Sequence, residues 1–338
     1  MAVAFSLLLG LSTDGRVEMG NGPATISASE TARQRLWNLV RIDDSTPGRL
    51  AFLLSLPALV FLVAIIAYPT LDALYLSLHR LGVAQLRTGE LVFLGLQNYV
   101  TVLGDSLFHL SLQNTFVFTV ISVFCQVVLA LLIALGINMR ASSLARISKL
   151  LVLLPFAIPP VVNALIWGFI LHSKYGYANI ILYNLHLIPQ FIHWLGDPRI
   201  ALFAVIIPYV WRTTPFSVLL FHAALQGIPE ELYEVAKTDG ASAWTCFWRI
   251  TLPLLRPVMA VVLVLRTTWA FMVFDEILAL TQGGPGNATW TAGWYAYYTS
   301  FYPPIEMGVG SAAAYVLTLL IGIAAFVYVR FVYRVVEY

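Results

Sequence analysis

The chain has 338 residues, of which 59% are hydrophobic and only 11% are charged, and its mean hydropathy is +0.82. A soluble domain carries roughly 25% charged residues, so this composition indicates an integral membrane protein. The net charge of +2 is too small to indicate nucleic-acid binding, and the two separated cysteines, Cys125 and Cys246, imply no disulfide framework.

Residues 1–48 are expected to form a cytoplasmic N-terminal tail that is partly disordered or lies on the membrane surface. Its apolar stretch, Val3–Leu11, is shorter than the roughly 20 residues that span a bilayer. No basic segment precedes that stretch, so a cleaved signal peptide is not expected. Met1 and Met19 both remain candidate start residues.

Six largely uncharged runs follow, each long enough to cross about 30 Å of hydrocarbon as a helix. We expect spans at about 50–78, 114–139, 150–173, 200–228, 258–280 and 307–333, all within one transmembrane domain over residues 49–338. Pro155, Pro159 and Pro160 should bend the third span. The sequence therefore predicts an all-α membrane fold.

A seventh uncharged stretch, Tyr175–Gly196, competes with these six. It contains several polar side chains that are costly for a lipid-facing helix. These are Asn179, Asn184, His186, Gln190 and His193. A seventh span would also invert the topology of everything that follows it, so the distribution of basic residues decides between the two alternatives.

Six spans with a cytoplasmic N-terminus place most basic residues inside. The inner segments hold Arg16, Arg33, Arg35, Arg41, Arg49, Arg140, Arg146, Lys149, Lys237, Arg249, Arg256, Arg330 and Arg334. The outer segments hold only Arg80, Arg87, Lys174 and Arg199. This bias obeys the positive-inside rule, so six spans with both termini in the cytoplasm are expected.

The most polar inner segment is a hairpin at 229–257. Pro229 and the following pair Glu230–Glu231 suit the first turn of a helix. Leu232, Val235 and Ala236 then form an apolar stripe at helical spacing. Gly240 suits the left-handed conformation that ends a helix.

The second half of the hairpin should form another short helix. Ser242 suits its N-cap, Phe247 and Ile250 lie on it, and Pro253 is expected to interrupt it. The resulting helix–turn–helix is too polar for hydrocarbon and too short to be a domain. We therefore expect a partner outside the membrane to bind it.

The last outer loop, 281–305, begins with Gly283, Gly284, Pro285 and Gly286, which oppose regular helix there. Aromatic residues follow at Trp290, Trp294, Tyr295, Tyr297 and Tyr298. Such side chains are typical of the membrane interface, and their faces also bind sugar rings. Both interpretations stay open for this loop.

The hairpin sequence resembles the EAA loop of ABC-importer permeases. Glu234, Ala236 and Gly240, then nine residues, then Ile250-Thr251-Leu252-Pro253 match its pattern, and Val235 stands where an alanine is usual. The resemblance implies a coupling helix that docks on an ATP-hydrolysing subunit, although an ordinary amphipathic surface hairpin is the alternative. The coupling residues that it implies are Glu234, Ala236, Asp239, Gly240, Ala241, Ile250, Leu252 and Pro253.

Four further blocks resemble the carbohydrate-importer branch of these permeases, which includes those for maltose, trehalose and glycerol 3-phosphate. They are F-L-G-L-Q-N-Y at 93–99, W-R-T-T-P-F at 211–216, F-D-E-I-L-A-L-T-Q-G-G-P at 274–285 and G-V-G-S-A at 308–312. The resemblance covers roughly Leu50 to Tyr333 and implies the type I ABC importer permease fold, in the cytoplasmic membrane of a bacterium or archaeon.

The partners follow from the same resemblance. They are ABC ATPase subunits, two of them expected, a second related permease, an extracytoplasmic solute-binding protein, the lipid bilayer and a sugar or polyol. None of the three lysines, Lys149, Lys174 and Lys237, lies in a nucleotide-binding glycine-rich loop. ATP and magnesium are therefore expected on the ATPase subunits, with no cofactor on this chain and alternating access as the mechanism.

Polar or aromatic side chains within or beside the spans are candidates for the substrate path, because burying them in a membrane is expensive. They are Asn163, Arg212, Arg266, Trp269, Phe274, Asp275 and Glu276. Arg212 and Arg266 could instead form structural ion pairs or extend to an interface. Asn163 could join helices, Asp275 and Glu276 could be a solvated helix end, and both aromatic residues could simply pack.

Other classes of function find less support. The six histidines lack metal-ligand spacing, and we find no catalytic arrangement of side chains, so neither a metal site nor an enzyme is expected. A self-contained secondary transporter is the alternative. It would need carboxylates at the bilayer midplane and inverted repeats, and the sequence indicates neither.

Overall fold

The computed structural model describes residues 47–138 and 151–332. The predicted tail at 1–48 lies almost wholly outside the described residues. The chain divides between Tyr68 and Pro69 into two units. In the first unit, α3 (Pro47–Leu62) continues into a π-helical turn, Val63–Ala67. Its side chains from Ala51 onward are almost all exposed.

The second unit begins within α4 (Tyr68–Ser77), which leads into a small antiparallel hairpin. In that hairpin β1 (His79–Arg80) pairs with β2 (Val92–Phe93), and α5 (Val83–Thr88) lies between them. The buried Asn98 amide of α6 (Gln97–Gly104) donates to the carbonyls of Ser77 and His79, at 2.8 and 2.9 Å. These two bonds fix the hairpin against the rest of the unit.

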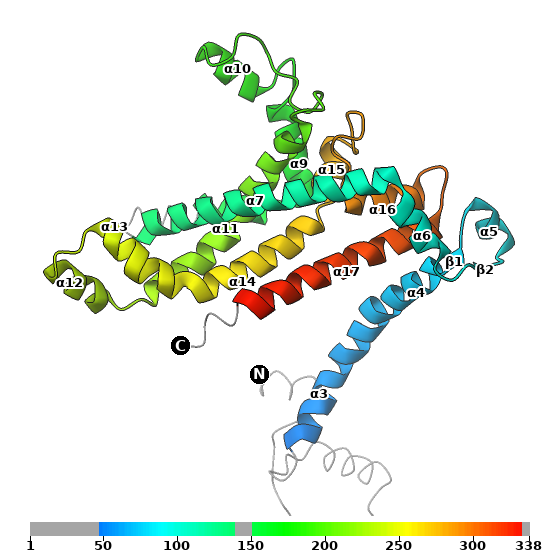
Figure 1. Ribbon diagram of the computed structural model, residues 1–338, viewed down its shortest axis with the longest axis horizontal. Coiled ribbons are helices and arrows are strands. Elements are labelled where there is room, and N and C mark those ends of the chain that lie inside the picture. The colour runs from blue at the N-terminus through cyan, green and yellow to red at the C-terminus, as the bar shows by residue number, and fades with distance from the viewer. Residues whose placement is uncertain (1–46, 139–150, 333–338) are drawn as a thin grey trace, which may run out of the picture. The chain divides into compact units, whose positions relative to one another are not determined.

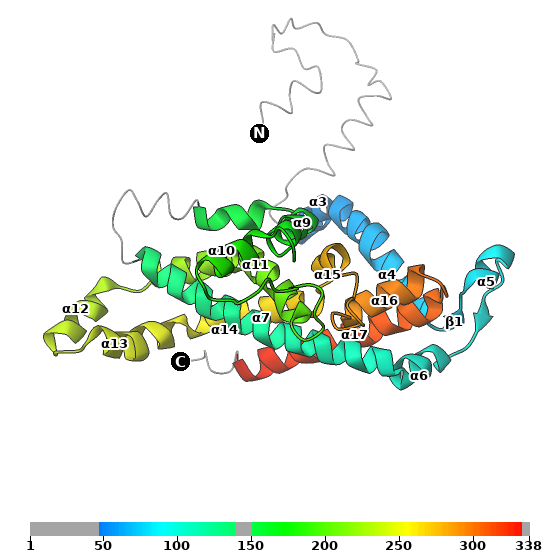
Figure 2. The same cartoon turned by 90° about the horizontal axis from the view of Figure 1, so that it is seen from above.

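Four long helices run side by side in the second unit (Figures 1 and 2). They are α7 (Ser106–Asn138), α11 (Ala201–Gln226), α14 (Leu252–Phe271) and α17 (Met307–Val332). One buried cluster, with Phe118, Tyr209 and Trp294, lies toward the end that carries α16 (Ala292–Phe301). A second, with Phe221 and Leu255, lies toward the end that carries α12 (Glu230–Thr238).

The helices agree with six predicted spans in number but not at every boundary. Among the described residues five helices are long and apolar enough to cross a membrane, or six if one bent pair forms a single span. α7 begins at Ser106 rather than 114, because the Asp105 carboxylate accepts from the Leu107 N–H at 2.8 Å and starts the helix early. α14 ends at Phe271, and α15 (Asp275–Leu280) forms a separate helix.

The third predicted span, 150–173, is the bent pair. Its helical pieces Leu151–Ala157 and Pro160–Ile170 meet at 109°. The first piece ends in a 3-10 turn, η2 (Leu154–Ala157), and the second is α9 (Pro160–Ile170). Pro159 and Pro160 supply no N–H groups to continue the helix, so the chain breaks there.

The stretch Tyr175–Gly196 forms no long helix, as the sequence predicted. It contains α10 (Tyr177–Asn184) followed by irregular chain. The Asn179 side chain holds the two together: its amide donates to the Ile192 carbonyl at 2.9 Å, and its oxygen accepts from the Ile192 N–H and the Trp194 indole, both at 3.0 Å. This network replaces the backbone bonds that a longer helix would make.

Candidate functional site

The hairpin at 229–257 projects beyond the long helices at one end of the second unit (Figure 1). Its first helix, α12, follows Pro229 and has Glu230 and Glu231 in its first turn, as the sequence predicted. Gly240 ends this arm with φ +80°, a conformation that favours glycine. The Ala241 N–H donates to the Ala236 carbonyl at 2.9 Å and closes the turn.

The second arm begins as predicted but continues differently. Ser242 caps α13 (Ala243–Cys246), with its hydroxyl accepting from the Thr245 N–H at 3.2 Å. The predicted interruption at Pro253 is wrong. The chain passes through a π-helical turn, Phe247–Thr251, and Pro253 falls in the first turn of α14, where its missing N–H removes little from the helix. Helical structure therefore runs without a break over Ala243–Phe271.

Both arms of the hairpin expose apolar side chains. Val235 on α12 is 61% exposed, and Trp244 on α13 is 69% exposed. The predicted stripe therefore faces outward; Tyr233, which is half-buried, joins the arms by a 2.8 Å hydrogen bond to the Thr251 hydroxyl. Trp248, also exposed, packs edge-on to Trp244. The sequence analysis did not predict this tryptophan pair, although the i, i+4 spacing places both side chains on one face of a helix.

The implied coupling residues separate into two sets. Glu234, Asp239 and Gly240 are exposed, and Ala236 and Ala241 are half-buried beside them at the turn. The others lie where the second arm enters the long helices and are half-buried there: Ile250, Leu252 and Pro253. The hairpin thus has an exposed tip and a packed base, and α14 extends directly from that base.

A polar pocket of about 220 Å³ lies near the other end of α14. Arg212 of α11 forms an ion pair with Glu276 of α15, with Nη2 at 3.0 Å and Nε at 3.3 Å from Oε1. Glu276 is almost fully buried, and it is the carboxylate that neutralises Arg212 there. The pair joins two elements that are 64 residues apart in the chain.

Five of the predicted path residues line this pocket: Arg212, Trp269, Phe274, Asp275 and Glu276. Tyr209 and Phe156 also line it and were missed. Tyr209 lies one turn before Arg212 on the same helix face, which is a usable signal, whereas nothing in the sequence connects Phe156 to α11.

Two predicted path residues lie outside the pocket wall. Arg266 is fully buried, its Nε donates to the Ser217 hydroxyl at 2.8 Å, and its guanidinium lies over the rings of Phe216 and Trp269 at 5.1 and 5.0 Å. Asn163 is also buried and donates to the Pro208 carbonyl at 3.1 Å. This bond favours the helix-joining alternative for Asn163, and the ring contacts favour a packing role for Arg266.

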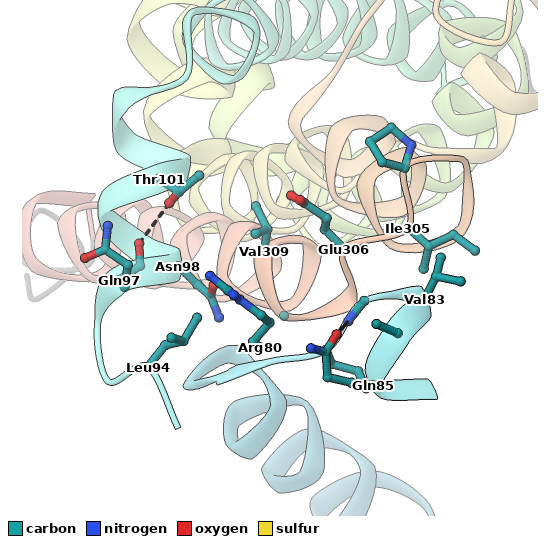
Figure 3. Close-up of a pocket in the computed structure, with 15 residues that line it drawn as sticks. Arg80, Val83, Gln85, Leu94, Gln97, Asn98, Thr101, Ile305, Glu306 and Val309 are labelled. Carbon is teal, nitrogen blue, oxygen red and sulfur yellow. Dashed lines mark hydrogen bonds between the residues drawn. The ribbon is translucent and has the colours of Figure 1, made fainter. Parts of the chain in front are cut away.

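A larger pocket of about 580 Å³ lies between the β1–β2 hairpin and the start of α17 (Figure 3). Arg80, Gln97 and Glu306 line it, and none of the three was predicted. They place a guanidinium, an amide and a carboxylate in a wall that is otherwise more apolar than polar. Gly308 also lines the pocket and packs tightly against β1, because a Cβ there would lie 2.3 Å from the His79 carbonyl oxygen.

Residues 126–337 match the family described as binding-protein-dependent transport system inner membrane component. The trehalose/maltose transport system permease protein MalF of Thermococcus litoralis is 39% identical over 283 residues, which is 84% of this chain and 93% of that protein. The sulfoquinovosyl glycerol transport system permease protein SmoG of Agrobacterium fabrum is 35% identical over 87% of this chain and 97% of its own length.

A third relative, the lactose transport system permease protein LacF of Rhizobium radiobacter, is 30% identical over 80% of this chain and 89% of its own length. Among solved structures, a chain of a bacterial ABC transporter involved in the import of alginate has a TM-score of 0.72 at 23% identity, covering 90% of this chain and all of that one, and supports the fold. This protein therefore belongs to the family of inner-membrane components of binding-protein-dependent transport systems.

Proposed function

We propose that this chain is the permease subunit of an ATP-driven importer that moves a sugar or a related polyol by alternating access. The projecting hairpin carries the proposal, because it combines an exposed apolar surface with a glycine turn that matches the EAA pattern. Relatives named for trehalose, maltose, sulfoquinovosyl glycerol and lactose support a carbohydrate substrate.

The hairpin is the element on which a separate ATPase subunit acts. Its exposed tip, with Glu234 and Asp239 beside Val235 and Trp244, offers charges and apolar area to a cleft on that subunit. ATP and magnesium bind to the ATPase subunits, two per complex. The ATPase can shift the conformational equilibrium only if it binds the two states of the permease with different affinities.

α14 connects this tip to the pocket. Ile250, Leu252 and Pro253 form the base of the hairpin, and the same helical stretch ends at Phe271, beside Trp269 and Met272 in the pocket wall. A rigid helix transmits a tilt along its length, so movement of the hairpin changes the pocket. Arg212, Asp275 and Trp269 offer polar and aromatic contacts to a solute there. Arg266 and Asn163 stabilise the helices that form the pocket through their bonds to Ser217 and Pro208.

The proposed binding of an ATPase subunit to the hairpin also sets the orientation of the chain in the membrane. The hairpin and both termini lie in the cytoplasm, in the cytoplasmic membrane of a bacterium or archaeon. The opposite end, with α16 and the β1–β2 hairpin, meets an extracytoplasmic solute-binding protein. A second, related permease completes the membrane part of the complex.

Purification of the tagged chain from its native membrane, followed by reconstitution in liposomes, tests this proposal. We expect an ABC ATPase and a second permease to co-purify, and uptake of labelled trehalose or maltose to require internal ATP and the binding protein. A chain that transports solute alone, driven by a proton or sodium gradient, would contradict the proposal.

A further inference from the structure

The pocket of about 580 Å³ lies where two candidate membrane spans end. The span Ala51–Ser77 ends just before β1, and the span Met307–Tyr328 begins directly after Glu306, which lines the pocket. Asn98, another residue of the wall, bonds to the Ser77 carbonyl and fixes the end of the first span there. The hydrocarbon is about 30 Å thick within a bilayer of about 40–45 Å, so a pocket at the end of a span lies in the headgroup layer.

Two side chains of opposite charge line this pocket without pairing. Arg80 comes from β1, and Glu306 precedes α17 and forms an antiparallel backbone bridge with Gly82. Figure 3 shows Arg80 and Glu306 at the pocket, each extending from its own segment. Among the residues that the structure describes, neither side chain has an ion-pair or hydrogen-bond partner. A ligand that offers an anionic group to Arg80 and a cationic group to Glu306 would satisfy both.

Two amide side chains add hydrogen-bond donors to the wall. Gln97 on α6 is exposed, and its side-chain amide has no partner in the described part of the chain, so it can donate to a ligand. The side-chain oxygen of Gln85 on α5 accepts from the Gly82 N–H at 3.2 Å, which leaves its amide nitrogen to donate. The pocket volume falls within the range of about 300–1,000 Å³ that is typical of small-molecule sites. The wall can therefore bind a polar group that carries both charges.

The segment 83–96, which supplies part of the pocket wall, also exposes large apolar side chains. Phe93 on β2 and Leu96, just before α6, are each 67% exposed. The others are Val83, Leu86, Leu91 and Val92. A cluster of this kind is costly in water, whereas the boundary between headgroups and hydrocarbon covers apolar and polar atoms side by side. The surroundings of the pocket therefore suit a lipid.

We propose that this pocket binds the headgroup of a zwitterionic phospholipid such as phosphatidylethanolamine, with the phosphate at Arg80 and the ammonium group at Glu306. The acyl chains then lie against the apolar side chains of 83–96. An anionic headgroup, as in phosphatidylglycerol, would satisfy Arg80 but would leave Glu306 without a partner and near a second negative charge. The pocket is separate from the hairpin at 229–257 and from the pocket of about 220 Å³, so the lipid site goes beyond the proposed function and does not depend on it.

A side chain of the solute-binding protein is the competing occupant, because that protein is proposed to meet this end of the chain. The depth of the pocket favours the lipid. Its wall includes the buried residues Asn98 and Gly308, and a Cβ on Gly308 would lie 3.3 Å from the Leu76 carbonyl oxygen of α4. A lipid reaches this depth from within its own leaflet, whereas a soluble protein would have to insert a side chain through the headgroup layer.

Photolabelling with lipid analogues tests the proposed site. The full complex, purified from its native host, is placed in phosphatidylglycerol nanodiscs. These contain a small fraction of either phosphatidylethanolamine or phosphatidylglycerol that carries the same diazirine near its glycerol. We expect the phosphatidylethanolamine analogue to label peptides from 80–101 and 304–309 at several times the yield of the phosphatidylglycerol analogue. Equal yields from the two analogues would overturn the inference without any variant.

Charge variants of the wall test each contact. Glu306→Gln should bring the ratio of the two yields close to one, because only the ammonium contact is lost. Arg80→Gln should lower the labelling by both analogues several-fold, because both headgroups carry a phosphate. Arg87→Gln and Glu90→Gln are the matched controls and should keep the parent ratio, since both residues are exposed on the same hairpin and neither lines the pocket. Recovery of each variant in the assembled complex shows that it folds.

The remaining outcomes identify other occupants. If the preference for phosphatidylethanolamine persists in the Glu306 variant, or if labelling is spread evenly over the lipid-facing helices, the bound lipid is adventitious and the inference is overturned. If both wall variants keep the parent labelling but weaken binding of the solute-binding protein several-fold, the pocket receives that protein, and the lipid site is overturned in the same way.

Discussion

The α12–α13 hairpin and the pocket beside α15 lie near opposite ends of one helical stretch, Ala243–Phe271, and are built in different ways. The hairpin is held by contacts within a short segment, such as the Ser242 cap and the bond from Tyr233 to Thr251. The pocket depends on pairs such as Arg212 and Glu276, which are far apart in the chain. Changes in the hairpin should therefore affect coupling with little loss of stability, whereas changes in the pocket should affect stability or the handling of the solute.

A substitution at Gly240 should cause the largest loss of ATP-driven uptake. A residue with a Cβ is disfavoured at φ +80° by about 1–2 kcal/mol, and a β-branched residue most of all, so Gly240→Val should distort the tip and reduce ATP-driven uptake to background while the chain still inserts. Gly89→Val is the matched control, because Gly89 also has positive φ (+73°) and both sites have open space for a Cβ. Uptake in liposomes and membrane content by immunoblot measure the two effects. Normal uptake by the Gly240 variant would contradict the coupling role.

Breaking the ion pair should have the next largest effect. Arg212→Ala leaves Glu276 buried without its partner, which should lower the free energy of unfolding by about 3 kcal/mol and reduce uptake as well. Thermal unfolding in detergent and uptake measure these losses. The charge-swapped double variant Arg212→Glu with Glu276→Arg should recover part of the stability. If the swap is no more stable than either single variant, the two side chains do not act as a pair.

One tryptophan in each region should affect a different kinetic parameter, either the KM for the sugar or the stimulation of ATP hydrolysis. Trp269→Leu in the pocket wall should raise the KM for the sugar several-fold, while ATP hydrolysis stays dependent on the binding protein. Trp244→Ala, at the exposed tip, should weaken the stimulation of ATP hydrolysis and leave KM nearly unchanged. Uptake and ATPase assays on the same liposomes separate the two. If both variants changed the KM and the stimulation of ATP hydrolysis in the same way, the two regions would not have separate roles.

The smallest expected effect concerns Tyr295, outside both regions. Its hydroxyl donates to the Asp105 carboxylate at 2.6 Å, and Tyr295→Phe should cost about 1.5–3 kcal/mol of stability. Burial, with that hydrogen bond, raises the pKa of Tyr295 above its usual range. A raised pKa keeps the stabilisation complete below the ordinary tyrosine value of about 10 and removes it as the pH rises further. The difference in melting temperature between Tyr295→Phe and the parent should therefore be constant from about pH 6 to 9; a steady decline over that range would contradict the assignment.

The difference between local contacts in the hairpin and long-range contacts in the pocket also explains how much of each could be predicted from the sequence. The start of α12 after Pro229, the Gly240 turn and the Ser242 cap depend on neighbours in the chain, and the structure confirms each. The predicted interruption at Pro253 was wrong because a π-helical turn, Phe247–Thr251, precedes the proline and the helix continues through it.

The pocket could be predicted only in part. A charge within an apolar run marks Arg212 and Glu276 as unusual, but their pairing depends on α15 folding back toward α11 after α14 ends. Phe156 reaches the same pocket only because the chain breaks at Pro159–Pro160. The sequence predicted a bend there, but it does not specify the direction that the chain takes afterwards.

The central claim is that ATP hydrolysis on another subunit drives this chain through its hairpin. A photo-crosslinker at Val235, in the complex purified from the native membrane, tests the claim most directly. We predict a covalent adduct with the ATP-hydrolysing subunit whose yield changes between the nucleotide-free and ATP-bound states. A complex that contains the ATPase and transports sugar, yet gives no such adduct in either state, would contradict the claim.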